Sequence, residues 1–182
     1  ILEPNYANAY AMAAVGYAFL GATGQMQPNE AFKVVHTYSD KALQLDSSLA
    51  AGYVAKGSAY LLYDWKWKEA YDSLLKAIEL NPAATGDHQM LSFYYTITGR
   101  KKEAVDIMEK ALQVDPLSPR VIQLLAETYL NAGRPDDALK QAEWLFDIHP
   151  HMRAAADLKG WCHGAQGDWK KAAAIFEEVQ KL

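Results

Sequence analysis

The segment GYAFLGAT (16–23) comes closest to a nucleotide-binding motif in this sequence. Its spacing follows the phosphate-binding loop GxxxxGK[ST], in which a lysine neutralises the β- and γ-phosphates. Ala22 stands where that lysine is required, and the glycines fall in or just after an expected helix, with no strand before them. The missing cation argues against a nucleotide site, and we expect no cofactor.

Histidine is the next residue type that could do chemistry. His149 and His151 flank one proline, whereas His88 and His163 lie far from each other in the sequence. A zinc site needs three or four ligands at fixed spacings, and neither CxxC nor HExxH occurs. Packing or solvent exposure is therefore favoured over metal binding for these four of the five histidines.

Cys162 is the single cysteine. His163 follows it, but neighbouring residues on a helix point apart, so the two form a poor nucleophile–base pair. No GxSxG segment and no pair of carboxylates stands out, so we expect no catalytic residue and no enzyme. A single cysteine also excludes an intrachain disulfide and fits a reducing, cytoplasmic compartment.

Composition narrows the choice of partner. Of 182 residues, 51% are hydrophobic and 22% are charged, as in an ordered globular protein. The net charge of −4 and the lack of long basic runs argue against direct nucleic-acid binding. The longest apolar run, residues 9–22, is too short to span a bilayer and predicts a packed helix. No targeting signal is visible.

A fixed period organises the chain. Pro82, Pro116 and Pro150 lie 34 residues apart (116 − 82 and 150 − 116), and each ends a similar segment: KAIELNP, KALQVDP and WLFDIHP. A period of this size predicts stacked repeats. It divides the chain into five units: 5–48, 49–82, 83–116, 117–150 and 151–182. ILEP (1–4) matches the end of a preceding repeat, so we interpret the chain as a fragment of a longer protein.

Two units depart from this period. The second carries one extra residue, which we place at the turn YDWKW (63–67). The first carries nine, about five of them in the loop GATGQMQP (21–28) and four in its second helix. Four residues are about 1.1 helical turns, so the apolar face is kept. This face contains Ala31, Val35, Tyr38, Ala42 and Leu45.

The fourth unit shows the repeat most plainly. Its first helix carries Ile122, Leu125, Ala126 and Tyr129, Gly133 follows at the turn, and the second helix carries Ala138, Ala142 and Leu145. This order resembles the tetratricopeptide repeat. The resemblance covers essentially the whole chain and implies an all-α fold, a right-handed superhelix of about five helix pairs that acts in protein–protein interaction.

A narrower resemblance concerns residues 59–82 and 99–119. Their sequences, AYLLYDWKWKEAYDSLLKAIELNP and GRKKEAVDIMEKALQVDPLSP, are similar to C-terminal repeat arrays of bacterial multidomain signalling and transcription regulators. In such proteins a DNA-binding, kinase or cyclase domain precedes the repeats. The resemblance implies a docking or sensory module of a larger regulator.

Several large side chains occupy repeat positions. Tyr60, Tyr63, Trp65, Trp67 and Tyr71 could form a stacking platform for bases or a ligand. However, Trp67 and Trp169 share one repeat position, and large recurring residues are more often packed between repeats, so we favour a core role. Lys56 and Lys159 stand where leucine is usual, and we favour packed stems with the ammonium groups in water over a ligand role.

In this family the first helices line a concave groove, and the residues between the packing positions project into it. The position of each residue within its repeat gives the candidate contacts for a protein or peptide partner. They are Gln89, Phe93, Arg120, Gln123, Glu127, Asp157 and Trp161. The same phase predicts an apolar groove end in the first two units, at Ala11, Val15, Ala18, Val54, Ser58 and Leu61. Lys and Asn hold a carboxylate in chaperone-binding members, but Ala11, Val15 and Ser58 replace them here, so that specificity is not carried over.

Three hypotheses remain. The favoured one is a binding module that holds a peptide or a partner helix in the groove. The alternative is a homo-oligomer formed through the terminal repeats, because the last helix, within residues 167–182, has apolar residues and no polar cap after it. An enzymatic role rests only on the degraded loop and the histidines.

Overall fold

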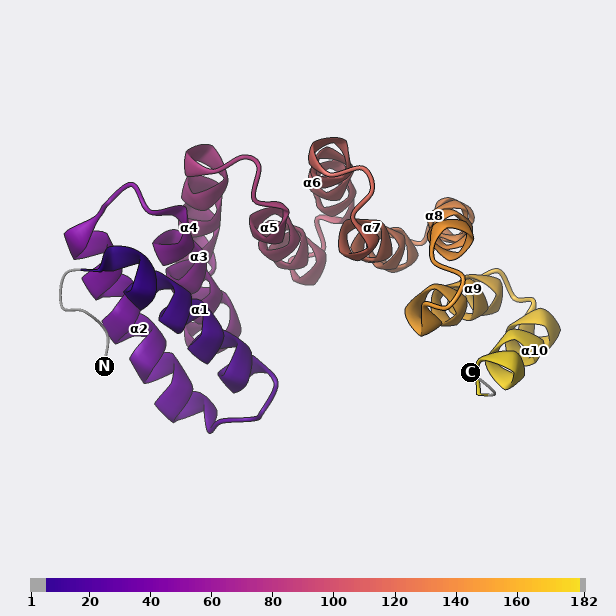
Figure 1. Cartoon of the computed structure of the whole chain (residues 1–182), viewed down its shortest axis with the longest axis horizontal. Helices are drawn as coiled ribbons and strands as arrows, with labels where there is room; N and C mark the ends of the chain where they lie inside the picture. Colours follow the sequence, from indigo (N-terminus) through magenta and orange to yellow (C-terminus); the bar gives the residue numbers. More distant parts are fainter. Residues whose placement is uncertain (1–5, 181–182) are drawn as a thin grey trace. The chain divides into compact units, whose positions relative to one another are not determined.

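The computed structural model describes residues 6–180, so Ile1–Pro4, predicted as the end of a preceding repeat, lie outside the described residues. The described part contains ten α-helices, one π-helix and no strand (Figure 1). The helices are α1 (Ala7–Ala22), α2 (Pro28–Leu45), α3 (Ala50–Ala59), η1 (Tyr60–Asp64), α4 (Trp67–Leu80), α5 (Thr85–Ile97), α6 (Lys101–Val114), α7 (Pro119–Asn131), α8 (Pro135–Ile148), α9 (Arg153–Ala165) and α10 (Trp169–Val179). The fold is therefore all-α, as the resemblance implied.

The chain forms two compact units, Ile1–Leu91 and Ser92–Leu182. The 34-residue period is visible in the starts of the second helices, because α4, α6, α8 and α10 begin at residues 67, 101, 135 and 169. The turns before the last three contain Gly99, Gly133 and Gly167 at φ of 77°, 78° and 85°. Glycine is favoured there because a Cβ atom disfavours this left-handed backbone conformation.

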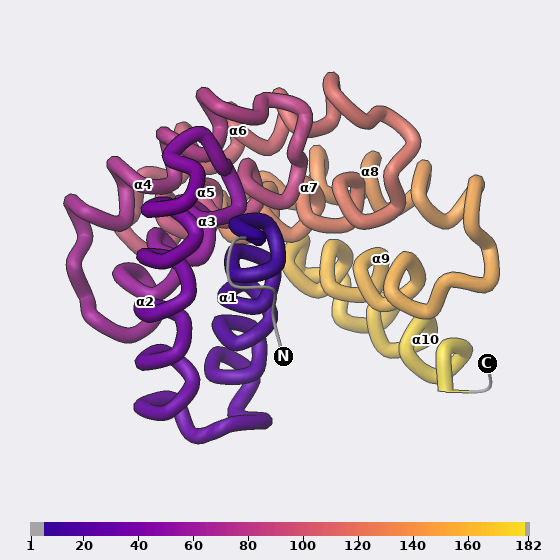
Figure 2. Tube along the Cα trace, turned by 60° about the vertical axis from the view of Figure 1, so that its left-hand side comes forward, coloured from indigo at the N-terminus to yellow at the C-terminus, as the bar shows by residue number. Residues whose placement is uncertain are grey.

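In the first unit, α1 and α2 lie side by side (Figure 2) and pack on α3. Their buried residues are mostly small: Ala14, Ala18, Val35, Ala55 and Ala59 surround Phe32. Small side chains let the helix axes approach closely. Helix α2 has 18 residues and α4 has 14, which agrees with the four extra residues predicted for the second helix of the first repeat.

The extra residue of the second repeat is absorbed by the π-helix η1 at the end of α3. This helix shares Tyr63 and Asp64 with the predicted stretch 63–67, so the extra residue lies at the start of that stretch. The hydrogen bond that closes this turn runs from the Lys66 N–H to the Tyr60 carbonyl at 2.9 Å, whereas the equivalent bond from Arg100 reaches only to Tyr95. A π-turn adds one residue without changing the register of the next helix.

In the second unit, α6, α7, α8 and α9 enclose one core. Its largest fully buried side chains include Met108, Ile122, Leu125, Leu145 and Leu158. Helix α9 also meets α10 closely, since a Cβ atom at Gly160 would lie 2.6 Å from the Phe176 ring. Close packing of this kind fixes the faces that the first helices turn to solvent.

Candidate partner-binding surface

Two rows of residues recur at the same repeat phase on successive first helices. One row contains Phe93, Glu127 and Trp161, and the other contains Gln89, Gln123 and Asp157. Phe93 and Trp161 expose 44% and 51% of their surface. Large apolar side chains that stay this exposed are candidates for contact with a partner.

Helices α7 and α9 contact each other, so their exposed residues are brought onto neighbouring elements of the second unit. Helix α7 supplies Arg120, which is exposed, and the half-buried Gln123 and Glu127. Helix α9 supplies Asp157 and Trp161. Gln89 lies in the first unit, where it is half-buried.

The polar candidates are partly engaged within their own helices. Gln123 Nε2 donates a hydrogen bond to Glu127 Oε1 at 2.8 Å. Arg153 Nε lies 3.7 Å from Asp157 Oδ2, with the Arg153 side chain largely in solvent. Such exposed pairs contribute little stability, so both carboxylates remain available to a cationic group of a partner.

The prediction of an open apolar groove end in the first two repeats is wrong. Ala11, Ala18, Val54, Ser58 and Leu61 are buried, so they form no open apolar end. The reason is that α1 packs against α3 as well as α2, and the small side chains at these positions allow that contact. The position of a residue within the repeat did not predict this burial, because it does not show how closely neighbouring first helices approach each other.

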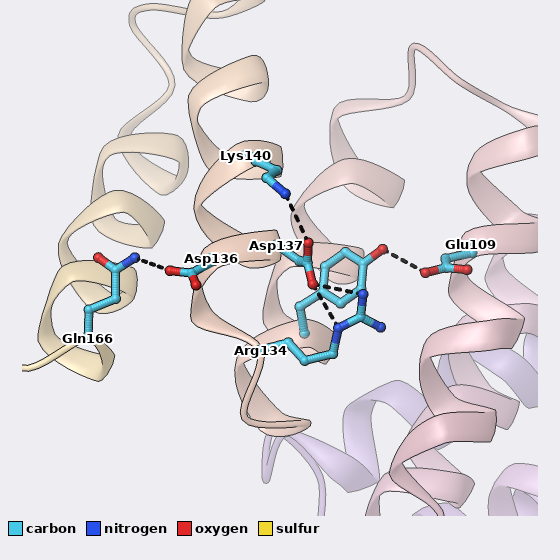
Figure 3. A network of polar contacts seen from close by, with 7 residues as sticks. Glu109, Arg134, Asp136, Asp137, Lys140 and Gln166 are labelled. Atoms are coloured by element: carbon cyan, nitrogen blue, oxygen red, sulfur yellow. Dashed lines mark hydrogen bonds and ion pairs between the residues drawn. The ribbon is translucent and has the colours of Figure 1, made fainter.

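A polar network in the second unit holds α6, α7 and α8 together (Figure 3). The Tyr129 hydroxyl donates to Glu109 Oε1 at 2.7 Å, and the Arg134 guanidinium lies 4.6 Å from the centre of the Tyr129 ring. Asp137 accepts hydrogen bonds from Arg134 at 2.8 Å and from Lys140 at 3.2 Å.

The network changes the acidity of its members. Burial, followed by the hydrogen bond to Glu109, raises the pKa of Tyr129. The hydrogen bond from Arg134 lowers the pKa of Asp137. Both residues are therefore held in the protonation states that the contacts require. The hydrogen bond from Tyr129 also ties α7, the helix that carries Glu127, to α6.

A similar contact links α8 to α9. Gln166 Nε2 donates to Asp136 Oδ1 at 2.7 Å, as Figure 3 shows, and Gln166 Oε1 lies 3.1 Å from His163 Nδ1. An amide oxygen only accepts, so His163 carries a hydrogen on Nδ1 in this arrangement. His163 is buried and serves packing, and His88 is likewise buried, with Nδ1 3.1 Å from the Ala84 carbonyl.

The other residues considered for chemistry lie apart from this surface. His149 and His151 are exposed between α8 and α9. Cys162 is fully buried, and burial raises the pKa of its thiol to about 11. Within residues 6–180, no three His, Cys, Asp or Glu side chains are grouped as metal ligands would be. In the same described range, no helix combines the length and the apolar character needed to cross a membrane.

The expectation of a core role is wrong for the tryptophans of the aromatic stretch, whereas Tyr60 and Tyr71 are half-buried. Trp65 exposes 65% of its surface, Trp67 39% and Trp169 72%. Trp67 and Trp169 are the first residues of α4 and α10, and a side chain there has no preceding helical turn to pack on. Trp65 occupies the turn itself at φ 58° and is the one non-glycine residue with positive φ among those described.

The two lysines at leucine positions both have partners. Lys56 Nζ lies 2.6 Å from Asp40 Oδ1, and this hydrogen bond raises the pKa of Lys56. Lys159 Nζ lies 4.5 Å from the centre of the Phe146 ring. The structure therefore adds a carboxylate and an aromatic face as neighbours of the two ammonium groups, and the prediction of packed stems with the ammonium groups in water stays a prediction.

Comparison with protein families adds an independent line of evidence. Two models described as tetratricopeptide repeat match residues 98–162 and 154–182. Residues 98–182 are thus similar to tetratricopeptide repeats. The starts of α4, α6, α8 and α10 keep the same 34-residue period, so the regular helix spacing begins in front of the matched segment.

Solved structures show the same fold over nearly the whole chain. A putative kinesin light chain of Podosopora anserina with nearly identical TPR-like repeats matches with a TM-score of 0.73 at 19% identity, covering 100% of this chain and 96% of that one. The protein MamA matches with a TM-score of 0.65 at 19% identity, covering 93% and 91%. YrrB, a TPR protein with an unusual peptide-binding site, matches with a TM-score of 0.62 at 22% identity, covering 91% and 84%. No curated protein sequence matches this chain.

Proposed function

We propose that this chain is a non-enzymatic protein–protein interaction module that binds a peptide or a partner helix on the exposed side of its first helices. The residues assigned to contact are Phe93, Arg120, Gln123, Glu127, Asp157 and Trp161, with Gln89 added from its repeat phase. The observation that carries the proposal is the exposure of Phe93 and Trp161, at 44% and 51%, at the same phase as Glu127.

The surface suggests the chemistry of the partner. Two aromatic side chains share a row with Glu127, and Asp157 adds a second carboxylate on α9. A segment with two apolar anchors and a basic side chain between them would satisfy these groups. The hydrogen bonds of the polar network in the second unit favour binding, because a preformed surface loses little conformational freedom when a partner binds. The peptide-binding site of YrrB, a protein of the same fold, supports this type of function.

Affinity capture tests the proposal. The tagged chain is used to capture partners from its source lysate, in parallel with Phe93→Ala/Trp161→Ala and with Trp169→Ala. We expect the double variant to lose the captured protein and Trp169→Ala, which removes an even more exposed aromatic outside the surface, to retain it. Equal capture by all three proteins would place the interaction elsewhere.

We also propose that the array serves in the cytoplasm, as the docking module of a larger bacterial regulator. The support is the similarity of residues 59–82 and 99–119 to such arrays, together with one buried cysteine in the whole sequence. The complete reading frame tests this part. A DNA-binding, kinase or cyclase domain beside the repeats would support it, and a domain of an extracellular enzyme would contradict it.

Self-association is the second candidate function. Trp169 on α10 exposes 72% of its surface. Near the same helix, an open cleft of about 360 Å³ is lined by residues of α8, α9 and α10 and of the α8–α9 connection, including Phe146, Ile175 and Val179. Light scattering over a range of concentrations tests this candidate. A dimer that dissociates in the Trp169→Ala/Ile175→Glu variant would support it, and a monomer at all concentrations would exclude it.

A further inference from the structure

A small cleft in the second unit is lined by three cationic side chains. Its volume is about 210 Å³, and it lies between the first turns of α6 and the turn that precedes α8. The lining residues are Lys101, Lys102 and Val105 of α6, with Ala132 and Arg134 of the turn. None of these five side chains is acidic, so the walls of the cleft carry positive charge only.

The cleft is open because a contact that exists in the next repeat is missing here. Asp136 and Gln166 lie 34 residues after Lys102 and Ala132, and their side chains are joined by a hydrogen bond of 2.7 Å (Figure 3). That bond ties the start of α8 to the turn after α9. Ala132 has no polar side-chain atom, so no such bond closes the equivalent place between α6 and the turn after α7. A lysine stands there in the position of the aspartate.

Lys101 and Lys102 lack a counter-ion. Both are exposed in the first turn of α6, and neither forms an ion pair within the part of the chain that the structure describes. Glu103 accepts a hydrogen bond from Arg100 at 2.8 Å, and Asp106 forms no ion pair with Lys102 although it lies about one turn away. Cations at the N-terminus of a helix oppose the helix dipole, so a bound anion would stabilise both lysines.

Arg134 adds a third cation whose position is fixed. Its guanidinium lies 4.6 Å from the centre of the Tyr129 ring, and its Nε and Nη2 lie 2.8 and 2.7 Å from Asp137 Oδ2. Asp137 is shared with Lys140 at 3.2 Å, so one carboxylate serves two cations. A guanidinium has five N–H donors, and those that do not point at Asp137 remain for an oxyanion in the cleft.

The carboxylates around the cleft do not cancel its charge. Segments 100–106 and 132–140 contain all the lining residues, and they carry five basic side chains (Arg100, Lys101, Lys102, Arg134 and Lys140) and four acidic ones (Glu103, Asp106, Asp136 and Asp137). Three of the four carboxylates are already hydrogen-bonded, to Arg100, Gln166 and Arg134. The excess positive charge therefore lies on the two unpaired lysines, in a chain whose net charge is −4.

We propose that this cleft binds the phosphate group of a phosphorylated serine in a partner protein. A phosphoserine carries about −1.5 to −2 charge near neutral pH and three acceptor oxygens, which suit two unpaired lysines and the free donors of one guanidinium. An anionic membrane surface is recognised by clusters of about four to eight basic residues, and only three line this cleft. The site shares no residue with the surface that contains Phe93 and Trp161, so it goes beyond the proposed function and does not depend on it.

Fluorescence anisotropy with a short labelled glycine–serine peptide that carries one central phosphoserine tests the proposal. We expect saturable binding by the wild-type chain, weaker binding of the same peptide with glutamate in place of phosphoserine, and no binding with serine. Lys101→Glu/Lys102→Glu should raise the dissociation constant at least about tenfold. Lys102→Asp/Ala132→Gln installs the pair that closes the equivalent place in the next repeat, and it should weaken binding as strongly while the melting temperature is kept.

Lys170→Glu/Lys171→Glu is the matched control, because Lys170 has the repeat position of Lys102 and the change in net charge is the same. It should leave phosphopeptide binding unchanged, as should Phe93→Ala/Trp161→Ala, which separates this site from the proposed partner surface. No saturable binding, equal binding of the serine peptide, or an equal loss in the Lys170→Glu/Lys171→Glu control would overturn the proposal. So would binding to phosphoinositide vesicles without binding to the phosphopeptide.

Discussion

Trp65 and Gly99 hold the same left-handed backbone position in successive repeats, at φ of 58° and 77°. For an L-residue this conformation costs about 1–2 kcal/mol relative to glycine. Since Trp65 is 65% exposed, its side chain recovers little of this energy through burial. The tryptophan that replaces glycine at this repeat position therefore strains the backbone of the turn at residue 65.

Replacement of Trp65 by glycine should therefore stabilise the protein. We expect the free energy of unfolding to rise by about 0.5–1 kcal/mol, after allowance for the greater freedom of glycine in the unfolded chain. For a chain of this length the melting temperature would rise by about 1–4 °C. Thermal unfolding monitored by circular dichroism measures this rise in melting temperature. Trp67→Ala is the control, because it leaves the turn backbone unchanged. A lower melting temperature for Trp65→Gly would show that the turn is not strained.

The contact between Tyr129 and Glu109 should be energetically coupled. The hydroxyl and the carboxylate are 2.7 Å apart and partly buried. We expect Tyr129→Phe to lower the free energy of unfolding by about 1–1.5 kcal/mol. A double-mutant cycle with Glu109→Gln should give a coupling energy of about 1 kcal/mol, because each change removes the same bond. The exposed Asp106 on the same helix provides the control, and Asp106→Asn should show no coupling to Tyr129→Phe.

Asp87 should make stability depend on pH. Its burial raises the pKa of the carboxyl from 3.8 to about 6, so the folded state binds the proton more tightly than the unfolded state does. The stabilisation by protonated Asp87 is fully present below about pH 4 and is lost as the pH rises through about 6. Denaturant unfolding across this window should show that the wild type loses stability relative to Asp87→Asn, which cannot ionise. Parallel pH profiles of the two proteins would contradict this account.

Cys162 should be inert in the folded protein. The thiol is fully buried, and burial raises its pKa to about 11, so little thiolate exists near neutral pH. Iodoacetamide at about pH 8 should modify it only after denaturant is added. Rapid alkylation of the native protein at a rate typical of free cysteine would show that α9 opens more readily than its packing indicates.

Most of the fold could be predicted from the sequence, because each recurring residue of the repeat serves a single purpose. Some of these residues pack between helices, and others form the turns. Ala104, Ala138 and Ala172 recur at buried positions of the second helices, and Gly99 and Gly133 recur at the turns. The added length of α2 was predictable for the same reason, since an insertion of about one helical turn keeps the apolar face in register.

The candidate sites were less predictable. Periodicity identified Phe93 and Trp161 as residues without a packing role, and both are exposed. It placed Trp67 and Trp169 in the core, because size and recurrence do not distinguish a core position from the open first residue of a helix. The signal for Trp65 was present in the sequence, as a large residue 34 positions before Gly99, but its meaning depends on the backbone conformation there.

We propose that the partner binds the exposed row on the first helices of the second unit, which contains Phe93, Glu127 and Trp161. Isothermal titration of the captured partner into the wild type, Phe93→Ala, Trp161→Ala and Trp169→Ala tests it most directly. Our account predicts dissociation constants raised about tenfold or more by Phe93→Ala and Trp161→Ala and unchanged by Trp169→Ala, with melting temperatures alike. Unchanged dissociation constants for both Phe93→Ala and Trp161→Ala would contradict it.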